Sequence, residues 1–334
     1  MQIELINSTP FVPLQFESID SRLNHFGVVV LRGTFDIRNG KRLKLTKEQE
    51  TLVLEDQYFG PPESSSLRFD SSLSPYKPKT DVLVEARAYS PSGAPEESWV
   101  SSIRAPKLDK SFRVTGPRRW ERRARGMQLS DIEPVVSVDV RYENAYGGVR
   151  ADGSRFESNP VGVGCNPRTE SIACVPQLLP IYIERPIFGQ EMEPIGLGPI
   201  APSWQPRLRR GGTLDDHWKE TRAPYLPKDF SFEFYNVASE AMTFPGFAKG
   251  DEVFHLTNLS SERELKIGLP QIEMISMIQL EDGRIFPGPL NLDTIEFRIE
   301  EKKAFLQWRG IFPAQLAIRV IEIRMSAPEY MVEG

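Results

Sequence analysis

Alternation of apolar and polar residues dominates the first 145 residues and returns from residue 230 onward. Residues 135–142 place Val136, Val138, Val140 and Tyr142 on one face, which is the period-two pattern of a half-buried strand. The same reasoning predicts strands over residues 230–235, 253–256, 265–269, 272–280, 295–299, 304–308 and 318–324. The chain is therefore predicted to be mainly β, with antiparallel sandwich-like sheets, one long structured loop excursion and little helix.

Turn residues predict how some of these strands pair. The β-branched run 27–37 is followed by Asn39-Gly40, which predicts a hairpin over about residues 27–45. Strands over 81–89 and 99–103 flank a turn rich in proline and glycine, so we expect them to be antiparallel neighbours. Asp282-Gly283 predicts a second tight hairpin, and the polar residues 300–303 predict a third turn.

Regular patterning thins out between residues 146 and 229, where Gly and Pro recur every few residues. Loops longer than about 12–15 residues are uncommon inside compact domains and tend to be functional. One short helix is predicted over residues 214–221, with Thr213 as N-cap and Asp215 and Asp216 near the positive end of the helix dipole. The chain is thus divided into a β region (1–145), a motif-bearing excursion (146–229) and a second β region (230–334), within one compact unit.

Composition narrows the class of protein. The 334 residues are 40% hydrophobic, enough for a sizeable core, and the formal net charge of -5 disfavours nucleic acid as the main partner. No basic-then-apolar leader and no long apolar run is present, so we expect a cytoplasmic protein without membrane insertion. The basic run 118–125 is best interpreted as a solvated strand end whose arginines pair with carboxylates; nucleic acid or an acidic partner surface are the alternatives.

The residue types do not favour metal or covalent chemistry. Cys165 and Cys174 are expected to be free thiols in a reducing cytoplasm, and the three histidines are scattered, so neither a metal nor a cofactor is expected. Asp215, Asp216, His217 and Glu220 could form an acid, base or metal cluster, but acidic residues at a helix start already have a stabilising role. Because no nucleophile or phosphate-loop motif is present, no catalytic residue is assigned. A hydrolase using the Asp215/His217 region is the alternative.

A set of irregularly spaced motifs carries a family resemblance. Within residues 196–229 they are Gly196-Leu197-Gly198-Pro199, Trp204, Arg207, Gly212-Thr213, Asp215, Trp218, Leu226-Pro227 and Asp229-Phe230. Elsewhere they are Pro78-Lys79-Thr80-Asp81, Tyr146-Gly147-Gly148, Asn159-Pro160-Val161-Gly162 and Trp308-Arg309-Gly310. Over nearly its whole length the chain resembles a family of adaptors, built on a domain of unknown function, that accompanies bacterial type VI secretion systems.

The resemblance implies a non-enzymatic, cytoplasmic adaptor or chaperone. Such a protein binds a secreted toxin effector and helps load it onto the spike complex, of PAAR/VgrG type. The implied partners are the effector and a spike-tip protein. A structural component of the secretion machine is a further possibility.

The motif residues divide into candidate contact residues and candidate structural residues. Because interfaces favour Trp, Tyr and Arg, the candidates for partner binding are Trp204, Trp218, Tyr146, Asn159 and Arg207. The candidates for structural roles are Gly147, Gly148, Pro160, Asp215 and Asp229, since glycine and Asn-Pro are what tight turns require.

Two of these roles have alternatives. Tyr146-Gly147-Gly148 and Asn159-Pro160 fit a turn as well as they fit an interface. Arg207 and Asp215 are also predicted as a buried pair that pins the loop, while the proline-flanked Trp204 is predicted to dock a partner. Trp99 and Trp308 stand in strand-like contexts and are predicted to be core residues.

Overall fold

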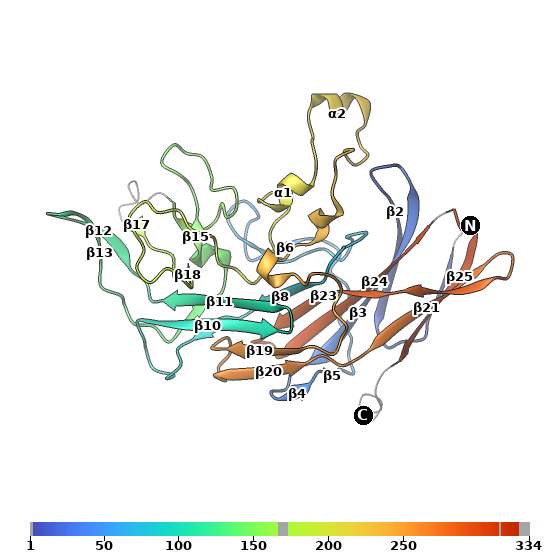
Figure 1. The fold of residues 1–334 in the computed structure, drawn as a ribbon, viewed down its shortest axis with the longest axis horizontal. Coiled ribbons are helices and arrows are strands. Elements are labelled where there is room, and N and C mark those ends of the chain that lie inside the picture. Colours follow the sequence, from blue (N-terminus) through green and yellow to red (C-terminus); the bar gives the residue numbers. More distant parts are fainter. Residues whose placement is uncertain (1–2, 166–172, 314, 327–334) are drawn as a thin grey trace.

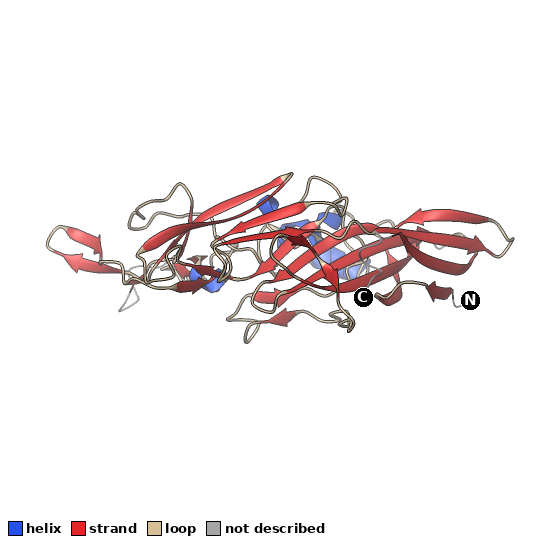
Figure 2. Cartoon of the chain, turned by 90° about the horizontal axis from the view of Figure 1, so that it is seen from below, coloured by secondary structure: helices blue, strands red, loops and turns tan. Residues whose placement is uncertain are grey.

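The chain folds into layered β-sheets with little helix, which confirms the predicted fold class (Figures 1 and 2). The computed structural model describes residues 3–165, 173–313 and 315–326. Two six-stranded sheets form the centre of this part of the chain, and a four-stranded sheet adjoins them. Figure 2 shows the sheets arranged along an elongated body.

The first six-stranded sheet combines strands from both ends of the chain. Its order is β2 (Val12–Ile19), β3 (His25–Asp36), β24 (Lys303–Pro313), β23 (Asn291–Arg298) and β8 (Asp81–Glu85), with β5 (Lys44–Leu45) also paired to β3. Its neighbours are antiparallel except β8 and β23, which run parallel. β3 is buried on both faces over most of its length, which explains its nearly continuous apolar run.

The second six-stranded sheet packs against the first. Its order is β18 (Leu178–Pro180), β11 (Leu108–Thr115), β10 (Ser98–Ala105), β19 (Val253–Thr257), β20 (Glu264–Gly268) and β4 (Lys41–Arg42). Only the β20–β4 pair is parallel. Both sheets thus contain strands from the two predicted β regions, so the boundaries at residues 145 and 230 separate no sheets.

The remaining elements are short or peripheral. The four-stranded sheet is β1 (Glu4–Asn7), β25 (Ile318–Ser326), β21 (Glu273–Leu280) and β22 (Ile285–Pro289). A small three-stranded sheet consists of β13 (Gly126–Leu129), β12 (Arg119–Arg123) and β17 (Ala173–Cys174). Three two-stranded sheets pair β14 (Ser137–Asp139) with β9 (Arg87–Tyr89), β15 (Tyr146–Gly147) with β16 (Val163–Gly164), and β6 (Gln57–Tyr58) with β7 (Leu67–Phe69). The helices are α1 (Arg207–Arg210) and α2 (Asp216–Thr221), with 3-10 turns η1 (Tyr142–Asn144), η2 (Phe232–Tyr235) and η3 (Glu240–Met242).

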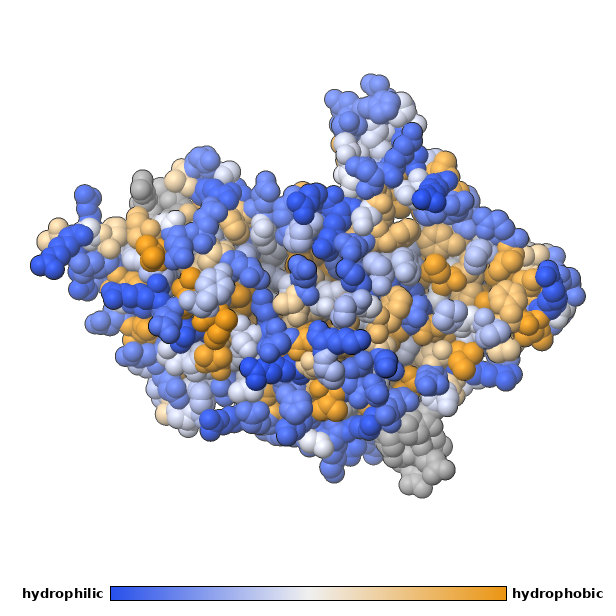
Figure 3. Space-filling view, in the orientation of Figure 1, coloured by the Kyte–Doolittle hydropathy of each residue, from blue (hydrophilic) through white to orange (hydrophobic). Residues whose placement is uncertain are grey.

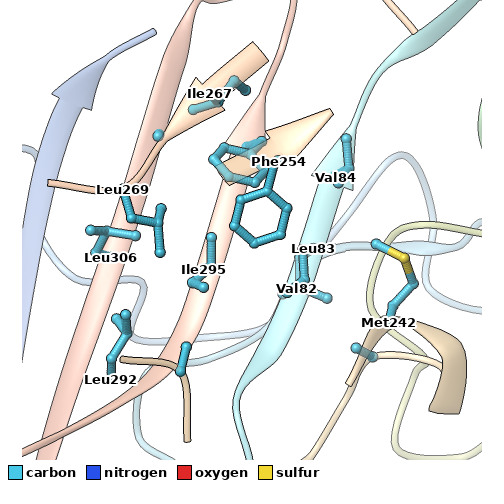
Figure 4. Packing of buried hydrophobic residues seen from close by; sticks show 14 of the residues in the cluster. Val82, Leu83, Val84, Met242, Phe254, Ile267, Leu269, Leu292, Ile295 and Leu306 are labelled. Carbon is cyan, nitrogen blue, oxygen red and sulfur yellow. The ribbon is translucent and has the colours of Figure 1, made fainter. Parts of the chain in front are cut away.

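The main core lies between the two six-stranded sheets. Phe254 of β19 meets Phe297 of β23 edge to face, with ring centroids 5.1 Å apart, and both rings are fully buried. Figure 4 shows Phe254 among Ile295, Val82 and their neighbours. Burying each such side chain stabilises the fold by about 1.5–3 kcal/mol. Trp99 and Trp308 are 5% and 2% exposed, which confirms their predicted place in the core.

Several local predictions are confirmed. The Asp282-Gly283 turn joins β21 to β22, and residues 299–302 form the turn between β23 and β24. The basic run forms the β12–β13 hairpin, where Arg119 and Arg123 pair with Glu121 at 3.3 and 2.9 Å. Cys165 and Cys174 are both free thiols.

One predicted strand pairing forms only in part, and another is wrong. Within the hairpin predicted over residues 27–45, only Phe35↔Leu45 and Asp36↔Lys44 pair, because residues 41–42 leave β3 and pair with β20. Asn39 holds the chain there by donating to the Glu264 carbonyl at 2.8 Å. The strands over 81–89 and 99–103 are not neighbours: β8 pairs with β23, β9 with β14, and β10 with β11 and β19.

Two predicted strands also differ. Residues 230–235 alternate like a strand but form η2, whose turn begins when Ser231 Oγ accepts the Glu233 N–H at 3.3 Å. The four aromatic rings in this segment pack on one another and are half-buried, so they cover much of their apolar surface without joining a sheet. The strand predicted over residues 135–142 shrinks to β14, and Val136 is exposed while Val138 and Val140 are buried.

Candidate functional site

The predicted excursion contains a buried base and a projecting tip. Figure 1 shows α2 at the end of a segment that stands away from the sheets. We call residues 212–229 the arm. Beneath it lies the anchor cluster, which we define as Asp70, Lys77, Asp81, Arg207 and Asn236.

Arg207 is the central side chain of the anchor cluster, and its residue is 5% exposed. Its Nη2 lies 3.1 Å from Asp70 Oδ1, while Nε and Nη1 donate to the Phe234 and Ile200 carbonyls at 2.8 and 2.9 Å. The guanidinium carbon also lies 4.9 Å from the centre of the Phe234 ring. Arg207 therefore pins the chain as predicted, but its partner is Asp70; the predicted pair with Asp215 is wrong.

Two further charges complete the anchor cluster. Lys77 Nζ lies 3.0 Å from Asp81 Oδ2 and 4.0 Å from Asp70 Oδ2. Asp81 also accepts hydrogen bonds from Asn236 Nδ2 and from the Val237 N–H, each at 3.0 Å. Burial raises the pKa of Asp70, and the positive charges of Arg207 and Lys77 act against that rise. Removing one member would leave buried charge without a partner, which is strongly destabilising.

Trp204 packs beside the anchor cluster and is 4% exposed. Its ring meets Tyr142 edge to face at 5.5 Å, within a small core that includes Leu67, Ile200 and Ala201. The flanking prolines do keep the segment out of the sheets, but the ring turns inward because it completes this core. The prediction that Trp204 lies on an exposed docking surface is therefore wrong.

The Tyr146-Gly147-Gly148 motif and Asn159 also form an interior unit. Asn159 Nδ2 donates to the Tyr142 and Tyr146 carbonyls at 2.8 and 3.0 Å, and both Tyr146 and Asn159 are buried. A Cβ at Gly147 would lie 2.1 Å from the Asn159 carbonyl oxygen, so only glycine fits. Burial of the Tyr146 ring, next to Cys165, raises the pKa of its phenol. The partner-contact surface predicted for Tyr146 and Asn159 is not exposed here.

Gly148 and Pro160, the other two structural candidates of this unit, also lie where the backbone turns. Gly148 has a φ of +98°, and a Cβ there would lie 2.5 Å from the Gly162 carbonyl oxygen. The left-handed region favours glycine in any case. Pro160 is half-buried directly after Asn159, at the start of the turn that returns to β16.

The arm is held by local hydrogen bonds. At its base, Asp229 accepts the Thr213 N–H at 3.0 Å and the Thr213 Oγ1–H at 2.7 Å, and these bonds lower the pKa of Asp229. At its tip, Asp215 Oδ1 accepts the Trp218 N–H at 2.8 Å, so Asp215, not the predicted Thr213, is the N-cap of α2. Trp218 Nε1 donates to the Tyr225 carbonyl at 2.9 Å and closes the loop.

The arm combines this local order with exposure. Leu214 and Tyr225 are 55% and 46% exposed, and Trp218 is half-buried. Of the five predicted contact residues, only Trp218 thus has accessible surface at the arm. Leu214 and Tyr225 were missed by sequence reasoning, because an isolated apolar residue in a loop gives no signal of its exposure.

The acidic residues considered for a hydrolase do not come together in one site. Asp215 is an N-cap, Asp216 pairs with Lys219 at 2.9 Å, and Asp229 binds Thr213. Among the residues that the structure describes, no group of three or more His, Cys, Asp or Glu could hold a metal ion. A hollow of about 240 Å³ lies elsewhere, lined by Arg68, Arg87 and Arg141 among others, and no arm residue borders it.

Two of the five members of the anchor cluster were indicated by the sequence. Asp81 and Arg207 stand in the motifs, whereas Asp70, Lys77 and Asn236 were not singled out. Lys77 adjoins the Pro78-Asp81 motif, and its spacing of four from Asp81 was the available signal. Asp70 lies 137 positions from Arg207 in the sequence, so nothing local indicates the pair.

Comparison with known proteins gives a family match. The sequence model of the family DUF2169, described as "Uncharacterized protein conserved in bacteria", matches residues 23–309. No curated protein and no solved structure matches the chain. In the described part of the chain, no helix has the length and apolar character needed to cross a membrane.

Proposed function

We propose that this chain, which belongs to the bacterial DUF2169 family, is a non-enzymatic adaptor that binds a type VI secretion effector and helps load it onto a PAAR/VgrG-type spike complex. The irregularly spaced motifs of the sequence, and the family resemblance that they carry, support this proposal. The proposed site of action is the cytoplasm, before the effector leaves the cell.

One observation carries the proposal: three of the motif residues hold the arm, or the segments that flank it, in place. Asp81 and Arg207 belong to the anchor cluster below the arm, and Asp229 closes its base. An exposed segment held by buried, charge-paired residues beneath it is typical of a binding element on a rigid scaffold.

The chemistry of the arm suits a protein partner. Figure 3 shows a mainly hydrophilic surface on this projection, so it can stand in water when no partner is bound. Leu214 and Tyr225 give it two separate apolar contacts, and Trp218 lies between them in the sequence. Interfaces typically combine a few such anchors with a polar surround.

The experiment is co-purification of the parent chain with the toxin effector encoded beside its gene. Leu214→Asp and Tyr225→Asp are each expected to weaken the complex by at least about 2 kcal/mol, because each buries a charge at the contact. Ile285→Asp is the matched control, since Ile285 is 59% exposed on β22, away from the arm. If the parent retains neither the effector nor a spike-tip protein, the proposal is wrong.

A further inference from the structure

The outer edge of β2 is a row of main-chain groups without a strand partner. β2 ends the first six-stranded sheet and pairs with β3 over eight residues, from Val12↔Arg32 to Ile19↔His25. Within the described residues, no main-chain hydrogen bond joins β2 to any other segment. Such an edge is a ready template for one more strand.

The direction of each main-chain group follows from the neighbouring pairs. β24 occupies one side of β3 along its whole length, so β2 and β5 share the other side. On that side the Thr46 N–H donates to the Thr34 carbonyl at 3.1 Å, so the even-numbered residues of β3 face β2 and β5.

The same alternation fixes the orientation of β2. The even-numbered residues of β3 lie opposite Val12, Leu14, Phe16 and Ser18, so these four bond to β3. The residues between them, Pro13, Gln15, Glu17 and Ile19, direct their main-chain groups outward. Pro13 agrees independently, because a residue without an N–H fits an edge strand only where that N–H would face away from the sheet.

The β2 edge is joined to the arm. Arg222 of the arm donates from Nη2 to the Ser21 carbonyl, in the turn between β2 and β3 (Figure 1). That turn is held by Asp20 Oδ1, which accepts the Arg22 and Asn24 N–H groups at 2.7 and 2.8 Å. A protein bound at the arm therefore lies next to a free strand edge.

We propose that the outer edge of β2 binds an extended segment of the same partner protein by strand addition, an inference that rests on the proposed adaptor function. The added strand bonds to Gln15, Glu17 and Ile19 through its main chain. Its apolar residues, at every second position, pack beside the half-buried Leu14 and Phe16, which lie over Val28 and Leu52.

A second copy of β2 fits this edge poorly. Two antiparallel copies would each contribute Pro13, which donates no hydrogen bond, and the registers that avoid Pro13 bring two Glu17 carboxylates opposite each other. A strand from a different protein, without proline opposite Pro13 and without an acidic residue opposite Glu17, avoids both of these unfavourable contacts.

The test compares Gln15→Pro with Gln15→Ala, using the effector encoded beside the gene as the probe. Proline removes the outward N–H and spares the bonds to β3, as Pro13 already does, whereas alanine keeps that N–H. Gln15→Pro is expected to bind the effector about tenfold or more weakly, with a melting temperature close to that of Gln15→Ala. Gln15→Ala is expected to bind as the parent does.

Hydrogen exchange gives a second readout that does not depend on a variant. In the complex, the amides of Gln15, Glu17 and Ile19 should become protected, whereas those of Leu14, Phe16 and Ser18 should already be protected in the free protein. Binding of the effector by the parent and by Gln15→Pro with equal affinity, or no added protection, would overturn the strand-addition proposal alone.

Two other outcomes are equally decisive. A parent that does not bind the effector would overturn both the adaptor function and this inference. A dimer of the parent that Gln15→Pro abolishes, with effector binding unchanged, would assign the edge to a second copy and overturn the proposed occupant.

Discussion

The anchor cluster and the arm are adjacent in space and are stabilised in opposite ways. The anchor cluster joins residues far apart in the sequence, such as Asp70 and Arg207, through buried charges. The arm joins residues within 16 positions, such as Thr213 and Asp229 or Asp215 and Trp218, through exposed hydrogen bonds. Buried ionic contacts are costly to break, whereas exposed ones are worth little. Three motif residues, Asp81, Arg207 and Asp229, thus hold a locally ordered, solvated element on a base whose buried charges are costly to separate.

The two tryptophans give the largest expected contrast between the regions. Trp204→Ala empties a site in a small core beside Tyr142 and is expected to cost about 3–5 kcal/mol of unfolding free energy. Trp218→Ala is expected to cost less than about 1 kcal/mol globally, because the arm can loosen while the sheets stay folded. Urea unfolding of both variants measures this. Equal losses of stability would show that arm and base unfold as one unit.

Arg207 and Arg209 of α1 should differ nearly as much in their effect on stability. Arg207→Ala leaves the buried Asp70 carboxylate without its closest positive partner, so we expect a loss of about 3–5 kcal/mol and a lower melting temperature. Arg209 lies on the exposed side of the same helix, and Arg209→Ala is the matched control, with a change within about 0.5 kcal/mol. A melting temperature of Arg207→Ala equal to that of the control would contradict the anchoring role.

The smallest effect concerns pH at the base of the arm. Because the bonds from Thr213 lower the pKa of Asp229, the ionised form stabilises the arm above the ordinary aspartate pKa of about 3.9. This stabilisation is lost as the pH falls through the lowered pKa of the folded protein. Protection of the Thr213 amide from hydrogen exchange should fall over that window, after correction for the intrinsic exchange rate. In Asp229→Asn, the fall with pH should be absent; its persistence would assign the effect to another group.

Sequence patterns over a few residues correctly predicted features that depend only on neighbouring residues. The Asp282-Gly283 hairpin, the strands from residue 253 onward and the core positions of Trp99 and Trp308 all follow from period and turn chemistry. The short helix at the tip of the arm was also predicted, with the cap misplaced by two residues from Thr213 to Asp215.

Predictions failed where a residue had a choice of distant partners. Asn39-Gly40 is a good hairpin signal, but residues 41–42 gain a partner in β20. Residues 81–85 were expected beside their neighbours in sequence, and they pair with residues 294–298. Arg207 and Trp204 were recognised as notable, yet the partner of the first and the burial of the second depend on Asp70 and Tyr142.

The mainly β class follows from the sequence alone, because residue alternation and turn residues act over a few positions of the chain. It also indicated the region between residues 196 and 229 as the one with unusual side chains. Which strands are neighbours and which motif residues are buried depends instead on the fold of the whole chain. Strand pairing and charge pairing reward contacts between residues more than a hundred positions apart, and such contacts exist only once the chain has folded. The exposed tip of the arm and the open edge of β2 follow from the same long-range pairing, because the other described strands and core residues pair among themselves and leave these surfaces exposed.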